Sequence, residues 1–332
     1  MVAYKPLVSV IVPSYNHEKY LIHRLEGIFN QTYANIEVIF LDDCSTDNSR
    51  AILVQYATNP KVSHCVFNDI NSGNTFIQWN KGISLAKGEY IWIAESDDFC
   101  EHNFLEVVLQ PLIENKEITL SYCQSNRVDE FDNCIGDWLN HTDDLDPKVF
   151  LENFCMAGNI FIERFLIYRN VIPNASGVVF RKSIVDELGP IDVHSFLKYC
   201  GDWLLYLKLL TNNKIAYSAS KLNYYRYHSQ SVITIAHKTG KFLSYNGMDI
   251  NLRHMMVTFL KRTKPDNLRI ILTLNKQITA TLKYEKAFHL VRNNQKVKGL
   301  LILSTVLPMF VKKYKFRKNF ILRIERLLKP KK

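Results

Sequence analysis

The sequence predicts an α/β protein in which a mostly parallel sheet is flanked by helices and followed by an α-helical C-terminal extension. In the first hundred residues, apolar runs rich in β-branched residues alternate with amphipathic stretches, as in βα units. Acidic residues follow two of these runs directly. From about residue 235 the chain is rich in Leu, Ile, Lys and Arg, and its apolar residues recur at helical spacing.

The expected elements follow one another in a regular order. Strands are expected at 7–12, 36–41, 62–67 and 90–94. Between them, helices are expected at about 20–29, in the stretch that ends at about residue 57, and at 79–85. Further along, 104–113 is expected to be helical, and 118–123 and 215–219 are expected to be strands. The polar stretch 126–147 is expected to be a loop over the cleft, and 268–288 a helix.

The positive charge is concentrated at the C-terminus. The 332 residues carry a formal net charge of +10, yet residues 312–332 hold ten Lys or Arg against one acid, Glu325. The rest of the chain is therefore nearly neutral. Since a nucleic-acid-binding domain spreads basic residues over its binding face, this distribution argues against nucleic acid as a partner.

Cysteine usage and hydropathy indicate a cytoplasmic protein. The seven cysteines include no Cys-x-x-Cys pair, which predicts reduced thiols instead of a disulfide frame or a zinc site. Pro6 and the polar residues 14–17 interrupt any signal-peptide pattern. The longest apolar segment, 299–311, is shorter than the roughly 20 residues that cross a bilayer.

Carboxylates follow the second and fourth expected strands. Asp42 and Asp43 end one strand, and Glu95-Ser96-Asp97-Asp98 follows the other. Carboxyl ends of parallel strands meet at one edge of the sheet, where open α/β sheets bind ligands. Three carboxylates within four residues repel one another, so such a cluster needs a solvated turn, basic partners or a divalent cation. At a strand end it suits a metal that bridges phosphates. The tetrapeptide alone leaves open an acidic turn with Asp98 as the N-cap of the next helix.

Five short motifs occur in a set order. They are Val8 to Asn16 (VSVIVPSYN), Gln31 to Tyr33 (QTY), Asp42 to Asp47 (DDCSTD), Asn80 to Ile91 (NKGI and AKGEYI) and Ser96 to Asp98 (SDD). Residues 7–98 thereby resemble the nucleotide-sugar-binding half of a family 2 glycosyltransferase of GT-A fold, of the bacterial polysaccharide type. The resemblance implies a domain at 1–234, with a donor half at 1–100 and an acceptor half at 101–234. A basic helical region at 235–332 follows it.

The resemblance also implies a donor site. Tyr15 would lie against the nucleotide base. By position alone, its ring could equally be a structural aromatic side chain that covers the edge of the sheet. Asp43 would recognise a pyrimidine, which favours a UDP-sugar. Asp98 would hold Mn2+ or Mg2+, with Asp97 at the ribose or the water shell of the metal. The expected donor-binding residues are Pro13, Tyr15, Asn16, Asp43, Asn71, Asp97 and Arg226.

The catalytic base and the closing segment are assigned in the same way. Asp202 stands at a helix start, where a carboxylate interacts favourably with the helix dipole. The resemblance makes it the base that takes the acceptor proton in an inverting transfer. The Tyr-Arg-x-His-x-x-Ser string at 225–231 resembles the closing segment of the family. Its His228 would complete the metal shell or contact the diphosphate, and Arg226 would neutralise the diphosphate or pair with a structural carboxylate.

Together these inferences predict an inverting, metal-dependent hexosyl- or N-acetylhexosaminyltransferase. It would act on a lipid-linked glycan acceptor in cell-surface polysaccharide, O-antigen or lipopolysaccharide biosynthesis. The amphipathic, cationic segment 297–328 predicts peripheral attachment to the anionic inner face of the cell membrane, and its alternative is a helical cap on the catalytic domain. Two other functions stay open. A nucleotidyltransferase would usually carry a glycine- and lysine-bearing phosphate loop, and a non-catalytic scaffold would only bind nucleotide sugar.

Overall fold

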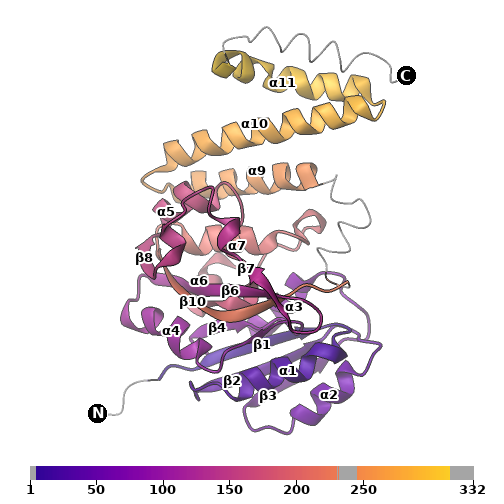
Figure 1. Cartoon of the computed structure of the whole chain (residues 1–332), viewed down its shortest axis with the longest axis vertical. Coiled ribbons are helices and arrows are strands. Elements are labelled where there is room, and N and C mark those ends of the chain that lie inside the picture. The colour runs from indigo at the N-terminus through magenta and orange to yellow at the C-terminus, as the bar shows by residue number, and fades with distance from the viewer. Residues whose placement is uncertain (1–4, 230, 232–244, 315–332) are drawn as a thin grey trace. The chain divides into compact units, whose positions relative to one another are not determined.

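The computed structural model describes residues 5–229, 231 and 245–314 (Figure 1). By its internal contacts the chain divides into two compact units. The first comprises Met1–Ile235 with Pro265–Asn267, and the second comprises Ala236–Lys264 with Leu268–Lys332.

The described strands of the first unit form one ten-stranded sheet with the order β3-β2-β1-β4-β9-β6-β10-β5, to which β7 is added on β6 and β8 on β10. The strands are β1 Val8–Ser14, β2 Ile36–Asp42, β3 Val62–Phe67, β4 Tyr90–Ile93, β5 Phe99–Cys100, β6 Ile118–Val128, β7 Cys134–Asp137, β8 Phe154–Ala157, β9 Val178–Arg181 and β10 Lys214–Arg226. The helices of this unit are α1 Glu18–Phe29, α2 Ser49–Tyr56, α3 Thr75–Leu85, α4 Phe104–Glu114, α5 Gly158–Phe161, α6 Lys182–Leu188 and α7 Gly201–Leu210.

The two halves of the sheet differ in strand direction. Strands β3, β2, β1 and β4 are all parallel, as predicted. The second half is mixed: β9 runs antiparallel to β4 and β6, whereas β6 and β10 are parallel to each other. Because β9 is antiparallel to both of its neighbours, β4 and β6 run in the same direction. Strands β4, β6 and β10 therefore end at the same edge of the sheet as β1.

Alternating side chains of the central strands pack on opposite faces of the sheet. Val10 and Trp92 belong to a buried cluster that includes the apolar residues of α1 and α4. Ile11 points to the other face, where α3 covers the sheet. A Cβ on Gly82 of α3 would stand 2.4 Å from Ile11 Cγ2, so glycine lets the helix approach the strand. Figure 1 shows α1 and α2 beside β1, β2 and β3.

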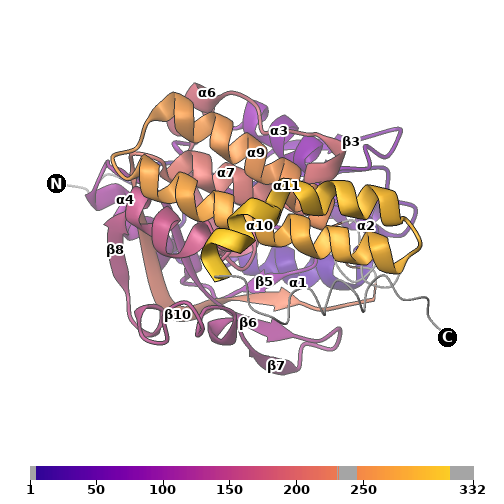
Figure 2. The same cartoon turned by 90° about the horizontal axis from the view of Figure 1, so that it is seen from above.

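The structure contradicts one expectation about local structure and one alternative that the tetrapeptide 95–98 had left open. The stretch 126–147 is not a continuous loop, because β6 continues to Val128 and pairs with β7 as a hairpin. Figure 2 shows β7, β6 and β10 side by side at one edge. Asp98 is not a helix N-cap, because β5 follows it and α4 begins only at Phe104. The strand at 215–219 is longer than expected and delivers Arg226 to the carboxyl edge.

The second unit is helical where it is described. Helix α10, Leu268–Arg292, packs against α9, Tyr245–Thr263, and against α11, Lys296–Tyr314. Inside it, Arg253 lies 3.7 Å from Asp249 and donates a hydrogen bond to Asn275 Oδ1 at 3.1 Å. Among the described residues, every helix is too short or too polar to span a bilayer.

Candidate active site

The candidate site lies where the order of the parallel strands reverses. Strands β2 and β3 lie on one side of β1, and β4 lies on the other. Open α/β sheets bind ligands at the carboxyl edge of such a switch point. The turn after β1 carries Tyr15, Asn16 and His17, and the loop after β4 carries 95–98. His228, just after β10, reaches the same edge.

At this edge, two imidazoles face one carboxylate. Asp97 Oδ2 lies 3.0 Å from His228 Nε2 and 4.0 Å from His17 Nε2. One ligand atom from each of these three residues falls within 4.8 Å of the other two. His17 Nδ1 is 2.8 Å from the hydroxyl oxygen of Ser96. The donor set, two imidazole nitrogens and one carboxylate oxygen, fits a divalent cation.

The pKa values of this cluster reflect its burial and its charges. Burial favours the neutral form of Asp97, but the imidazoles of His17 and His228 outweigh it and hold the pKa of this carboxyl well below its usual range. Burial lowers the pKa of His17, whereas the negative charge of Asp97 acts in the opposite direction. Asp97 therefore stays ionised beside two nitrogen donors.

Asp98 is placed differently from the prediction. Only 2% of this residue is exposed, and its carboxylate accepts hydrogen bonds from Asn174 Nδ2 at 2.9 Å and from the main-chain N–H of Arg226 at 3.0 Å. Burial and the charge of Asp97 raise the pKa of Asp98. The geometry thus puts Asp97, and not Asp98, beside the imidazoles, because the loop turns the Asp98 carboxylate inward as its own anchor.

Arg226 also has a different position from the one expected of a diphosphate ligand. Its guanidinium donates to the main-chain oxygen of Asp97 at 2.7 Å and to the carboxylate of Asp132, and lies 4.4 Å from the ring centre of Tyr20. The residue is only 2% exposed. Of the two roles left open by the sequence, the structure therefore favours pairing with a structural carboxylate.

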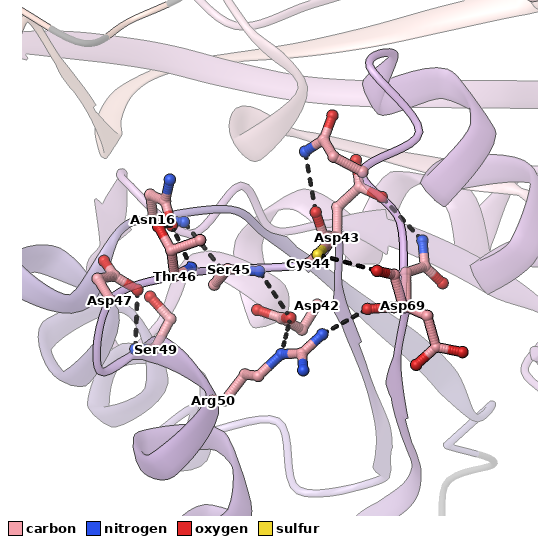
Figure 3. A network of polar contacts seen from close by, with 12 residues as sticks. Asn16, Asp42, Asp43, Cys44, Ser45, Thr46, Asp47, Ser49, Arg50 and Asp69 are labelled. Atoms are coloured by element: carbon pink, nitrogen blue, oxygen red, sulfur yellow. Dashed lines mark hydrogen bonds and ion pairs between the residues drawn. The ribbon is translucent and has the colours of Figure 1, made fainter.

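The turn after β2 is a dense polar network (Figure 3). Asp43 Oδ1 accepts hydrogen bonds from Asn68 Nδ2, the Ser72 N–H and Gln78 Nε2 at 2.8 to 2.9 Å. Its Oδ2 accepts one bond, from the Ser72 hydroxyl at 2.7 Å. With three donors on Oδ1 and one on Oδ2, the Asp43 carboxylate already accepts the roughly four hydrogen bonds that such a group can take, so these contacts fix its position in the turn.

Of the remaining residues predicted to bind the donor, Tyr15 is exposed, whereas Asn16 and Asn71 form hydrogen bonds within the protein and Pro13 is buried. Tyr15 is 45% exposed, so its ring is accessible. Asn16 has a positive φ of 56° and accepts a hydrogen bond from the Thr46 N–H at 2.8 Å, which joins the two turns. Asn71 donates to the Asp43 main-chain oxygen at 2.9 Å. Pro13 is buried within β1, one residue before the strand ends at Ser14.

Asp202 stands in the first turn of α7. Asn170 Nδ2 donates a hydrogen bond to Asp202 Oδ2 at 2.8 Å. Burial raises the pKa of Asp202 to about 6. Burial also raises the pKa of Tyr225 well above its usual value, and the charges of Asp98, Asp97 and Asp202 raise it further.

The sequence reasoning missed Arg24. This arginine is fully buried in α1, and its Nε donates to the main-chain oxygen of Glu95 at 2.8 Å. Its position was a detectable signal, because it is a charged residue spaced three and four residues from Leu21 and Ile28 on the apolar helix face. Glu95 accepts a hydrogen bond from Trp79 Nε1 at 2.8 Å, and burial raises its pKa to about 8.

An aromatic group, formed by Trp138, Tyr225 and Tyr227, was also missed. The ring centre of Trp138 lies 5.7 Å from that of Tyr225 and 6.4 Å from that of Tyr227. All three side chains are partly exposed. Their signal was the Tyr-rich strand end at 224–227, which the sequence reasoning treated only as the frame of Arg226 and His228.

Solved structures with the same architecture are glycosyltransferases of GT-A fold. The crystal structure of S. aureus TarS 1–349 superposes with a TM-score of 0.62 at 19% identity, over 92% of this chain and 80% of that one. The mannosyltransferase PcManGT from Pyrobaculum calidifontis, in complex with GDP-Man and Mn2+, gives a TM-score of 0.53 at 14% identity, over 94% and 82%. At these identities the likeness establishes the fold, which confirms the predicted class.

The sequence comparisons establish the family. A sequence model described as glycosyl transferase family 2 matches residues 9–186, more than half of the chain. The chain therefore belongs to glycosyl transferase family 2, as its motifs predicted.

Curated relatives are bacterial glycosyltransferases. The chain is 34% identical over 171 residues to the glycosyltransferase GlyG of Streptococcus pneumoniae, a match over 52% of this chain and 50% of GlyG. It is 39% identical over 114 residues to the putative teichuronic acid biosynthesis glycosyltransferase TuaG of Bacillus subtilis, over 34% of this chain and 45% of TuaG. The chain spans about half the length of these relatives.

Proposed function

We propose that this protein is an inverting glycosyltransferase that moves a sugar from a UDP-sugar to a hydroxyl group of a glycan acceptor. The observation that carries this proposal is the meeting of His17, Asp97 and His228 at the switch point of a GT-A sheet. Such a cluster can hold the cation that accompanies a diphosphate. Support for the donor comes from TarS, whose structure was solved in complex with UDP-GlcNAc.

The nucleotide would be held by the turns after β1 and β2. Tyr15 offers an exposed ring for stacking on the base. Asp43 would accept an N–H of a pyrimidine in place of one of its present donors, such as the Ser72 hydroxyl on Oδ2. Asn16 and Asn71 keep the two turns in this arrangement through their hydrogen bonds to Thr46 and Asp43. These residues therefore would orient the nucleotide of the donor.

The cation ligands proposed are Asp97 and His228, with Asp97 in the role that the sequence gave to Asp98. A bound divalent ion supplies positive charge to the leaving diphosphate. Mn2+ is a candidate, since PcManGT was solved with that ion. Arg226 and Asp98 then act as supports: they fix the loop that presents Asp97.

The transfer itself would be a single displacement. The acceptor oxygen forms a bond to the anomeric carbon while the bond from that carbon to the diphosphate oxygen breaks, and the nucleoside diphosphate leaves with the electron pair. Asp202 takes the proton of the acceptor hydroxyl, because its carboxylate is positioned by Asn170 and has a pKa close to neutrality. The partly exposed rings of Trp138, Tyr225 and Tyr227 suit the apolar face of an acceptor sugar.

The acceptor is proposed to be a lipid-linked glycan of a cell-surface polysaccharide, presented at the anionic inner face of the membrane. Helix α11 exposes Val297, Leu300 and Leu301 at helical spacing, and a strongly basic segment follows it in the sequence. Apolar and cationic residues together favour binding to anionic lipid. The kind of relatives supports a role in polysaccharide assembly, since TuaG is described as a teichuronic acid biosynthesis glycosyltransferase.

The test is release of nucleoside diphosphate from a panel of nucleotide sugars, with Mn2+ or Mg2+ and with acceptor glycolipid extracts. Wild type is compared with Asp97→Asn and with Asp143→Asn, a control at an exposed aspartate. We expect wild type to release nucleoside diphosphate from one UDP-sugar, and chelation of the metal ion should abolish this release. Asp97→Asn should lose the activity, whereas Asp143→Asn should retain it. Release of pyrophosphate would instead identify a nucleotidyltransferase. Donor binding without turnover under all conditions would identify a scaffold.

A further inference from the structure

We propose that His17 is a third protein ligand of the cation, so that two imidazoles and one carboxylate select a first-row transition-metal ion such as Mn2+ over Mg2+. This inference rests on the proposed function, because the cation is the one that accompanies the donor diphosphate.

The distances within the cluster separate two kinds of contact. His228 Nε2 is 3.0 Å from Asp97 Oδ2, which is a hydrogen-bond distance, whereas His17 Nε2 is 4.0 Å away. Ligand atoms that share an ion at about 2.1 Å lie about 3 to 4 Å from one another. The 4.0 Å separation is therefore too long for a hydrogen bond but fits a pair of ligands of one ion.

The other ring nitrogen of His17 is fixed by a neighbour. Its Nδ1 lies 2.8 Å from the Ser96 hydroxyl, which is fully buried. If the Nδ1 proton is donated to that hydroxyl, Nε2 presents its lone pair toward Asp97. Histidines that bind metals show this arrangement, with the second ring nitrogen held by an oxygen atom.

Helix capping does not account for this orientation. His17 is the N-cap residue of α1, yet among the described residues its side chain makes no capping hydrogen bond to that helix. Its main-chain N–H donates to the Ser49 hydroxyl at 3.1 Å, so the turn is held independently of the ring. The side chain is thus available for a role other than holding the turn.

The donor set determines which ions are favoured. Mg2+ prefers oxygen ligands and keeps much of its water, whereas imidazole nitrogen suits transition-metal ions. Asp98, which would have added an oxygen, has its carboxylate bound to Asn174 and to the Arg226 N–H. We therefore expect the affinity order Zn2+, then Mn2+, then Mg2+.

The experiment measures cation binding directly on the full-length protein. Mn2+ is titrated and its free fraction is followed by electron paramagnetic resonance, with and without UDP, and Mg2+ is measured by competition. We expect His17→Gln to weaken Mn2+ binding about tenfold or more. His17→Glu, which replaces the nitrogen by an oxygen of similar reach, should lower the ratio of Mn2+ to Mg2+ affinity. His254→Gln, at an exposed histidine of α9, is the matched control and should bind Mn2+ as wild type does.

Equal Mn2+ affinity of His17→Gln and wild type would overturn the inference, and so would an unchanged Mn2+ to Mg2+ ratio in His17→Glu. Thermal melting without metal shows whether each variant is folded. Ser96→Ala provides a second route, because loss of its hydroxyl should also weaken Mn2+ binding while leaving the ring in place. Failure of the proposed function appears separately, as absence of nucleoside diphosphate release by wild type that has bound Mn2+.

Discussion

Asp97 and Asp202 carry the same chemical group in opposite electrostatic surroundings. Two imidazoles keep the pKa of Asp97 well below its usual range, although burial acts against them. Asp202 has no imidazole among its principal interactions, so burial raises its pKa to about 6. Groups whose pKa values are separated in this way suit different roles, here an anionic ligand and a proton acceptor.

The first prediction concerns the pH dependence of transfer. A base must be ionised to accept a proton, so kcat/KM should fall as the pH drops below about 6 and should level off above it. Asp202→Asn should lose roughly 10²- to 10⁴-fold in kcat and should still bind the donor. Initial rates between pH 5 and 8 test this. Unchanged kcat in Asp202→Asn, with Asp143→Asn as control, would remove Asp202 from the mechanism.

The second prediction concerns the buried charge of Arg24. This guanidinium donates to the Glu95 main chain and favours the ionised forms of Glu95 and Asp98. Arg24→Met removes this charged donor and leaves the Glu95 main-chain oxygen without it, so the free energy of unfolding should fall by about 1.5 to 3 kcal/mol. Urea denaturation measures this difference.

Lys19→Met is the control for Arg24, since Lys19 is exposed on the same helix. An exposed substitution of this kind changes the free energy of unfolding by about 0.5 kcal/mol or less. If the two variants were equally stable, the loop after β4 would not depend on the buried guanidinium.

At the scale of elements, the approach of α3 to β1 depends on a missing side chain. A Cβ on Gly82 would stand 2.4 Å from Ile11 Cγ2, and Ile11 is fully buried in the sheet. We expect Gly82→Ala to lower the free energy of unfolding by about 1 to 3 kcal/mol, as other overpacked cores do. Thermal or urea melting provides the measurement.

Gly27→Ala in α1 is a matched control for Gly82. A Cβ at Gly27 would make ordinary contacts, the nearest at 3.5 Å from the Cys100 main-chain oxygen. Since alanine favours helix over glycine by about 0.5 to 1 kcal/mol, this variant should be neutral or stabilising. Equal effects at both positions would contradict the close approach of α3 to β1.

For the whole molecule, the basic C-terminal segment predicts binding to anionic lipid. Each Lys or Arg near such a surface contributes about 1 kcal/mol before screening by salt. The full chain should therefore sediment with phosphatidylglycerol vesicles, and less so at high salt. The double variant Leu300→Glu, Leu301→Glu should weaken binding, because both side chains are exposed on α11. Equal sedimentation with zwitterionic vesicles would contradict the electrostatic part.

The sequence by itself determined the parallel half of the fold, the family and the edge that bears the site. Strand period, β-branched runs and carboxylates at strand ends are local signals, and they placed Asp43 and Asp97 just after the correct strands. The apolar spacing after Gly201 placed Asp202 at a helix start. The described residues confirm those strands and the start of α7. The roles given to these residues stay proposals.

Only the tertiary structure decided which neighbours each side chain has. Asp97 and Asp98 are adjacent in sequence, yet one faces two imidazoles and the other is turned inward toward Asn174. His17 meets Asp97 because β1 and β4 are neighbours in the sheet, and no spacing in the sequence encodes that distance. Electrostatic roles depend on distance and burial in space, so they follow from the packing of the strands and not from the order of the residues.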